Sequence, residues 1–69
     1  MTIEDVIHRH QARIMSIAGV TGIGEGRKDD KPAVVVMVRQ LTPDIVSRIP
    51  TLLDGHPVVV EESGEIRAG

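Results

Sequence analysis

The chain has 69 residues, enough for one small domain over residues 1–69 and too few for a second. It has no cysteine, which excludes disulfides and thiolate metal sites, and no apolar run long enough to cross a membrane. A net charge of −2 and the lack of Phe, Tyr and Trp exclude the basic surface and the stacking side chains typical of nucleic-acid binders.

The N-terminal stretch MTIEDVIHRHQARIM carries charges throughout and lacks the apolar centre of a secretion signal. Together with the absence of cysteine, it favours a cytoplasmic protein. The stretch TIEDVIHRHQARIMSIAG predicts a helix with Thr2 as N-cap and Gly19 as its stop. One apolar stripe follows helical spacing along it: Ile3, Val6, Ile7, His10, Ile14 and Ile17.

Two strands are predicted next, VTGIGEGRK over residues 20–28 and AVVVMVRQ over residues 33–40, with a hairpin loop near residues 28–32. Thr42 and Pro43 then predict the N-cap and first position of a second helix, which Pro50 keeps short. Leu52 and Leu53 are expected to pack inward. A turn at DGHP leads into the strand PVVVEE, and the terminal IRAG is expected to form a short strand or a tail.

The order helix–strand–strand–helix–strand predicts an α+β fold. We expect a two-layer α/β sandwich, with two helices on one face of an antiparallel sheet of three or four strands. A wet sheet face normally alternates apolar and polar side chains, but the valine-rich strands here are apolar on both faces.

An uncovered apolar face marks an interaction site, and a small chain without staples gains stability by association. We therefore expect a homo-oligomer, or docking on a larger protein, through the open face of the sheet. The simpler alternative is that the helices and chain ends bury these strands. The residues expected at the interface are Ile23, Val35, Met37 and Val59.

The stretch GVTGIGEG contains Gly22, Gly24 and Gly26 at alternate positions. A dinucleotide-binding loop would follow a strand and open a helix, whereas this stretch follows a helix. The clamp of an RNA-binding KH domain joins two helices and is usually basic, which this stretch is not. A strand with one bare face, sharing the parity of Val20 and allowing close packing, is the better interpretation.

His8 and His10 are two positions apart on the predicted helix, so they point in nearly opposite directions and cannot chelate one ion. A metal site would need His56 or acidic groups brought close by folding, and no metal or cofactor is expected. No catalytic residue is expected either. The serines match no nucleophile motif, and the acids near the C-terminus are typical of a solvated turn. These residues are Ser16, Ser47 and Ser63, and Glu61, Glu62 and Glu65.

The segments HQARIMSIAGVTGIGEG, KPAVVVMV and RIPTLLDGHPVVVEESGEIRA together resemble a small bacterial module found alone or ahead of trypsin-like serine peptidase domains. Its element order is similar to that of the C-terminal half of the α-lytic protease pro-region. The resemblance implies a folding assistant that docks a sheet edge on a peptidase strand, and it carries over no catalytic residue.

The sequence thus predicts a non-enzymatic module for protein interaction or self-association, with a second copy or a serine peptidase domain as the partner. A small-ligand or divalent-metal-binding protein that uses the glycine-rich strand and His56 is the alternative. An RNA-binding relative of KH domains is a third hypothesis.

Overall fold

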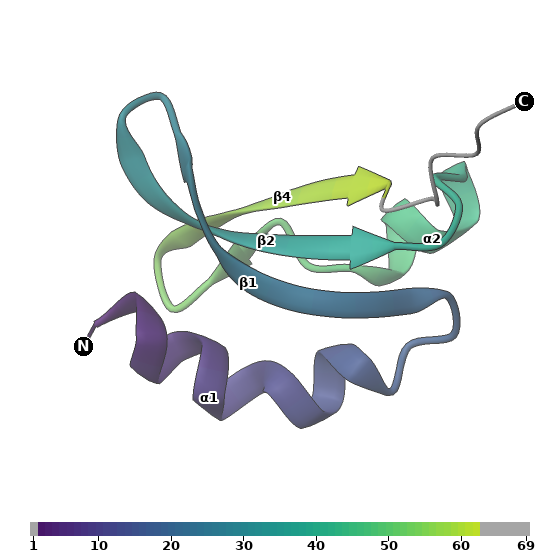
Figure 1. The fold of residues 1–69 in the computed structure, drawn as a ribbon, viewed down its shortest axis with the longest axis horizontal. Helices are drawn as coiled ribbons and strands as arrows, with labels where there is room; N and C mark the ends of the chain where they lie inside the picture. The colour runs from purple at the N-terminus through teal and green to yellow at the C-terminus, as the bar shows by residue number, and fades with distance from the viewer. Residues whose placement is uncertain (1, 63–69) are drawn as a thin grey trace, which may run out of the picture.

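The computed structural model describes residues 2–62, which fold into two helices and four strands (Figure 1). In chain order the elements are α1 (Ile3–Met15), β1 (Val20–Lys28), β2 (Lys31–Val38), α2 (Pro43–Arg48), β3 (Leu52–Leu53) and β4 (His56–Glu62). The predicted α+β class and element order are confirmed, and β3 is an additional short strand. The predicted role of the terminal IRAG lies outside the described residues.

Helix α1 begins with the cap that its sequence predicts. The Thr2 hydroxyl accepts a hydrogen bond from the backbone N–H of Asp5 at 3.2 Å, and the Asp5 carboxylate accepts one from the N–H of Thr2 at 3.3 Å. The helix ends at Met15, earlier than the predicted stop. Gly19 instead adopts a φ of +95° where the chain turns into β1, a conformation that glycine enters without a Cβ clash.

Strands β1 and β2 form the predicted hairpin. Asp29 and Asp30 make its turn with φ angles of 52° and 64°, and Lys28 pairs with Lys31 across it. Positive φ at both central positions is the signature of a type I′ turn, whose twist matches that of the flanking strands. The predicted position of the loop is therefore confirmed.

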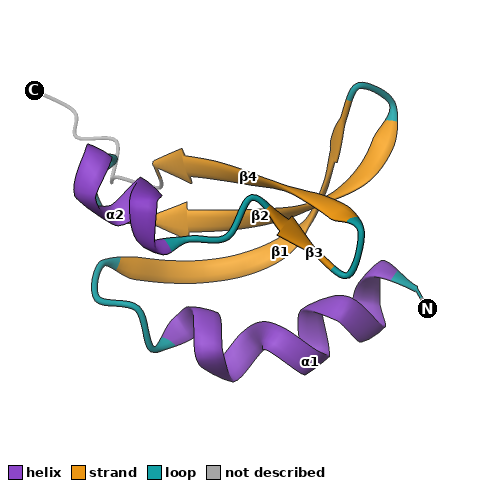
Figure 2. Cartoon of the chain, turned by 180° about the vertical axis from the view of Figure 1, so that it is seen from behind, coloured by secondary structure: helices purple, strands orange, loops and turns teal. Residues whose placement is uncertain are grey.

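The four-stranded sheet has the order β1-β2-β4-β3 and is mixed, so the prediction of an antiparallel sheet was wrong. The β1–β2 and β3–β4 pairs are antiparallel, but β2 and β4 run parallel, with Val34 opposite Val58 and Val36 opposite Val60. The physical reason is the connection between them. After α2 the chain returns across the sheet and reverses at the β3–β4 turn, so β4 starts at the same end as β2 (Figure 2).

The core lies between the helices and one face of the sheet. Val34, Val36 and Val38 of β2 are fully buried there. One cluster joins them to residues of both helices, of the C-cap of α2 and of β3: Ile3, Val6 and Ile14, Ile45, Ile49, and Leu53. Both helices thus contribute to one core, with α1 lying along the sheet and α2 near the ends of β2 and β4 (Figure 1).

Helix α2 is short for the predicted reasons. The Thr42 hydroxyl accepts a hydrogen bond from the N–H of Ile45 at 3.2 Å, Pro43 takes the first position, and the helix ends at Arg48. Of the two leucines expected to pack inward, Leu53 is buried, but Leu52 is 61% exposed. The expectation for Leu52 was wrong because neighbouring residues of a strand point to opposite sides.

Candidate functional site

The side of the sheet opposite the helices is the first candidate site, and we call it the outer face. Val35 and Met37 lie on it because they alternate with the buried valines of β2. Their cross-strand partners share that side: Gly24 and Gly22 on β1, and Val59 on β4 opposite Val35. These five residues are only partly buried, and Glu61, which pairs with Met37, is exposed.

Side chains of β2 lie over part of the glycine row, by which we mean Gly22, Gly24 and Gly26 of β1. A Cβ atom added at Gly22 would lie 2.9 Å from Cε of Met37, and one added at Gly26 would collide with Cγ2 of Val35. A Cβ added at Gly24 would meet nothing within 4 Å. Met37 and Val35 therefore lie over the row, which explains two of its three glycines within a single chain.

Ile23 does not lie on the outer face. It pairs with the buried Val36 and packs against the core, so it is on the opposite side of β1 from the glycines. The register also shifts between Val20, which pairs with Val38, and Gly22, which pairs with Met37. This β-bulge adds one residue to β1 and turns Val20 to the core, so Val20 does not share the parity of the glycines as predicted. Of the four expected interface residues, the structure brings together Val35, Met37 and Val59.

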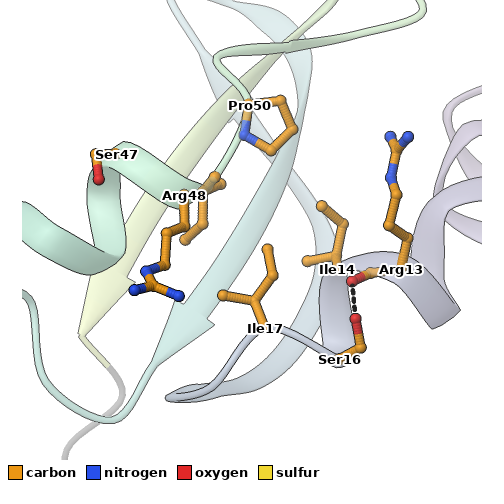
Figure 3. Close-up of a pocket in the computed structure, with 8 residues that line it drawn as sticks. Arg13, Ile14, Ser16, Ile17, Ser47, Arg48 and Pro50 are labelled. Carbon is orange, nitrogen blue, oxygen red and sulfur yellow. Dashed lines mark hydrogen bonds between the residues drawn. The ribbon is translucent and has the colours of Figure 1, made fainter.

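A pocket of about 480 Å³ is the second candidate site, between the C-terminal ends of α1 and α2. Ile14, Ile17 and Pro50 form much of its apolar wall, while Arg13 and Arg48 lie on opposite sides of it (Figure 3). The remaining lining residues are Ser16, Ser47 and Ile49.

The polar groups of this pocket are engaged locally. The Ser16 and Ser47 hydroxyls each donate a hydrogen bond of 2.6 Å to a backbone carbonyl in their own helix region, those of Arg13 and Asp44. Arg48 pairs with Asp44 one helical turn away, with 3.2 Å between Nε and Oδ2.

A polar cluster that includes Arg13 and joins α1 to a distant turn was not predicted from the sequence. Nε2 of His10 lies 3.0 Å from Oδ2 of Asp54, and Nη2 of Arg13 lies 2.8 Å from Nδ1 of His10. A guanidinium only donates, so Nδ1 accepts and the ring donates from Nε2 to the carboxylate. That hydrogen bond lowers the pKa of Asp54, and the nearby side chains of Arg9 and His56 lower it further.

The cluster joins α1 to the β3–β4 turn, in which Asp54 and Gly55 both have positive φ. The sequence offered two separate signals for it, a histidine on the apolar stripe and an Asp-Gly turn. Only the fold places them together. Asp54 supplies the carboxylate of the cluster, and Arg13 occupies the second nitrogen of the His10 ring.

The remaining predicted positions do not assemble into a site. His8 is exposed on α1. His56 has the parity of Val58 and Val60, which pack against the core, so it points away from the glycine row. Glu62 accepts a hydrogen bond from the backbone N–H of Leu41 at 2.9 Å. Ser63 and Glu65 lie outside the described residues. Within residues 2–62, no three histidine or acidic side chains gather closely enough to hold a metal ion.

Comparisons with known proteins assign no family. No protein-family model, curated protein or solved structure matches the chain. The resemblance to a peptidase pro-region therefore stays a prediction. None of the helices within residues 2–62 is long and apolar enough to cross a membrane.

Proposed function

We propose that the protein is a non-enzymatic interaction module that associates with itself through the outer face of its sheet. One observation carries the proposal. Val35, Met37 and Val59 lie side by side on a face that neither helix packs against, since both helices contribute to the core on the other face.

The energetics of a small domain support an interface at this face. Complete burial of a valine or methionine side chain contributes about 1.5–3 kcal/mol relative to exposure, and these three side chains are only partly buried in one chain. A second copy would complete their burial on both sides of the contact. For a chain of this size the gain is a sizeable fraction of the total free energy of folding.

The alternative, a ligand site made from the glycine row and His56, is less favoured. These groups point to opposite sides of the sheet, and Met37 and Val35 already lie over Gly22 and Gly26. The two arginines of the pocket face apart and do not converge on one point (Figure 3).

Sedimentation velocity over a dilution series tests the proposal. We expect wild-type protein to sediment as an oligomer that dissociates on dilution, and Met37→Asp to sediment at a lower mass. Val46→Asp is the matched control, because Val46 is 43% exposed on α2 and lies away from the outer face. Circular dichroism establishes that each variant is folded. A folded Met37→Asp variant with wild-type mass at every concentration contradicts the proposal.

A further inference from the structure

We propose that the free edge of β1 pairs with β1 of a second copy of this chain, in antiparallel register about a two-fold axis at Gly26. This contact uses the edge of the sheet and is separate from the outer face. It joins two sheets into one, through backbone hydrogen bonds and two pairs of opposite charges.

The relevant part of β1 is a projecting edge. β1 is the end strand in the order β1-β2-β4-β3, and β4 begins to pair with β2 only at Val34. Beyond that point the two strands run on as a ribbon to the turn at Asp29 and Asp30. In Figure 1 this ribbon rises away from α1 and from the rest of the sheet. An unpaired strand edge is a template for another strand.

The turn fixes which residues face the free edge. Lys28 and Lys31 flank a two-residue turn, so they form a hydrogen-bonded pair, and pairs alternate from there along an antiparallel ladder. Arg27 and Pro32 then form a pair without hydrogen bonds, which suits a proline because it has no N–H. Gly26 directs its N–H and C=O to β2, whereas Arg27 and Glu25 direct theirs outward.

Only some registers of the two β1 strands let these outward N–H and C=O groups form hydrogen bonds. Those registers differ in which charged side chains they set opposite one another. Centring the two-fold axis on Glu25 or on Arg27 sets that residue opposite its own copy, with like charges in contact. Centring it on Gly24 sets Glu25 opposite Ile23. Centring it on Gly26 sets Glu25 opposite Arg27 of the second copy, and this happens twice by symmetry.

The Gly26 register also suits the backbone. Glu25 and the partner's Arg27 would exchange two hydrogen bonds, and their side chains would lie on the same side of the joined sheet. Gly26 would face its own copy in a pair without hydrogen bonds, where the Cα atoms approach to about 4.5 Å and the lack of a side chain removes a clash. Both charged residues are exposed in the single chain, where Arg27 donates a hydrogen bond to the Asp30 carbonyl at 2.9 Å; pairing with Glu25 of the second copy would replace this exposed contact.

A charge exchange tests the pairing by sedimentation velocity. Glu25→Arg sets arginine opposite arginine across the axis, and Arg27→Glu sets glutamate opposite glutamate. We expect the dissociation constant of the edge contact to rise about tenfold or more in each single variant, because like charges opposite one another destabilise a strand pair. An equimolar mixture of the two variants, and the double variant, restore opposite pairs and should recover the wild-type mass.

Two control variants make the same changes of charge at positions outside the free edge of β1. Lys31→Glu alters the other strand of the same ribbon, and Glu4→Arg alters an exposed position on α1; both should keep the wild-type mass. The edge pairing is overturned if Glu25→Arg and Arg27→Glu each keep the wild-type mass, or if their mixture stays dissociated. Met37→Asp tests the contact through the outer face separately. A wild-type chain that is monomeric at all concentrations overturns both proposals.

Discussion

Nε2 of His10 lies 3.0 Å from Oδ2 of Asp54, although the residues are 44 positions apart in the sequence. The contact ties α1 to the turn that starts β4. Arg13 holds the other nitrogen of the ring at 2.8 Å, and Arg9 lies 3.9 Å from the same carboxylate oxygen. The cluster thus holds the N-terminal helix to the turn between the last two described strands.

Asp54→Asn is expected to lower the free energy of unfolding at neutral pH. Asparagine tolerates the positive φ of the turn, so the change removes charge with little strain. The hydrogen bond from His10 lowers the pKa of Asp54 in the folded chain. A lowered folded pKa contributes stability that is present above the unfolded pKa and is lost as the pH falls through the folded value.

The difference in melting temperature between wild type and Asp54→Asn should therefore shrink as the pH is lowered below the ordinary aspartate range. Asp29→Asn makes the same change at another residue with positive φ and serves as control. A difference for Asp54→Asn that is constant between pH 7 and pH 3 contradicts the role of the charge.

The glycine row predicts three different outcomes for one substitution. Gly26→Ala should lower the free energy of unfolding by about 1–3 kcal/mol, because the new methyl group collides with the branched side chain of Val35. Gly22→Ala should cost less, since its neighbour is the flexible end of Met37. Gly24→Ala meets nothing and should stabilise the single chain by about 0.5–1 kcal/mol.

Urea unfolding of the three alanine variants at a concentration that favours the monomer measures this order. Val35→Ala combined with Gly26→Ala is the internal control, because removing the Val35 methyl groups should recover part of the loss. Equal effects at all three glycines would contradict the packing described for the row.

Much of the fold could be predicted from the sequence, because local chemistry determined it. Thr2, Thr42 and Pro43 marked the helix starts, and the charged turn marked the first hairpin. The direction of β4 could not be predicted in this way. It depends on the path of the chain after α2, which is set by where Ile49 and Leu53 are buried and not by any local motif.

The candidate site was predicted in part, for a similar reason. Alternation within β2 identified Val35 and Met37 correctly as one face. It failed for Ile23, because the register that the hairpin turn sets places Ile23 opposite the buried Val36, on the core face. The bulge between Val20 and Gly22 changes only the start of β1, where it turns Val20 to the core. The contact between His10 and Asp54 was missed because it needs the whole fold.

The turn between β1 and β2 predicts an effect of backbone conformation. Asp30 has a φ of 64°, a region that is strained for residues with a Cβ and most strained for branched ones. Asp30→Val should lower the free energy of unfolding by about 1–2 kcal/mol, whereas Asp30→Gly should raise it by about 0.5 kcal/mol after the added freedom of the unfolded chain is counted. Arg27 donates to the backbone carbonyl of Asp30 at 2.9 Å, and both variants keep that carbonyl. Urea unfolding measures both variants, and a higher free energy of unfolding for Asp30→Val than for Asp30→Gly would contradict the turn geometry.

Leu52 and Leu53 provide the sharpest contrast between neighbours in the chain. Leu53 is 3% exposed within the core, and Leu52 is 61% exposed. Leu53→Ala should therefore lower the free energy of unfolding by about 2–5 kcal/mol, enough to unfold a domain of this size, while Leu52→Ala should change it by about 0.5 kcal/mol or less. Thermal melts followed by circular dichroism separate the two. Leu53→Met, which keeps the volume, should retain most of the stability, because the core needs an apolar side chain of that size where the chain crosses back from α2 to β4.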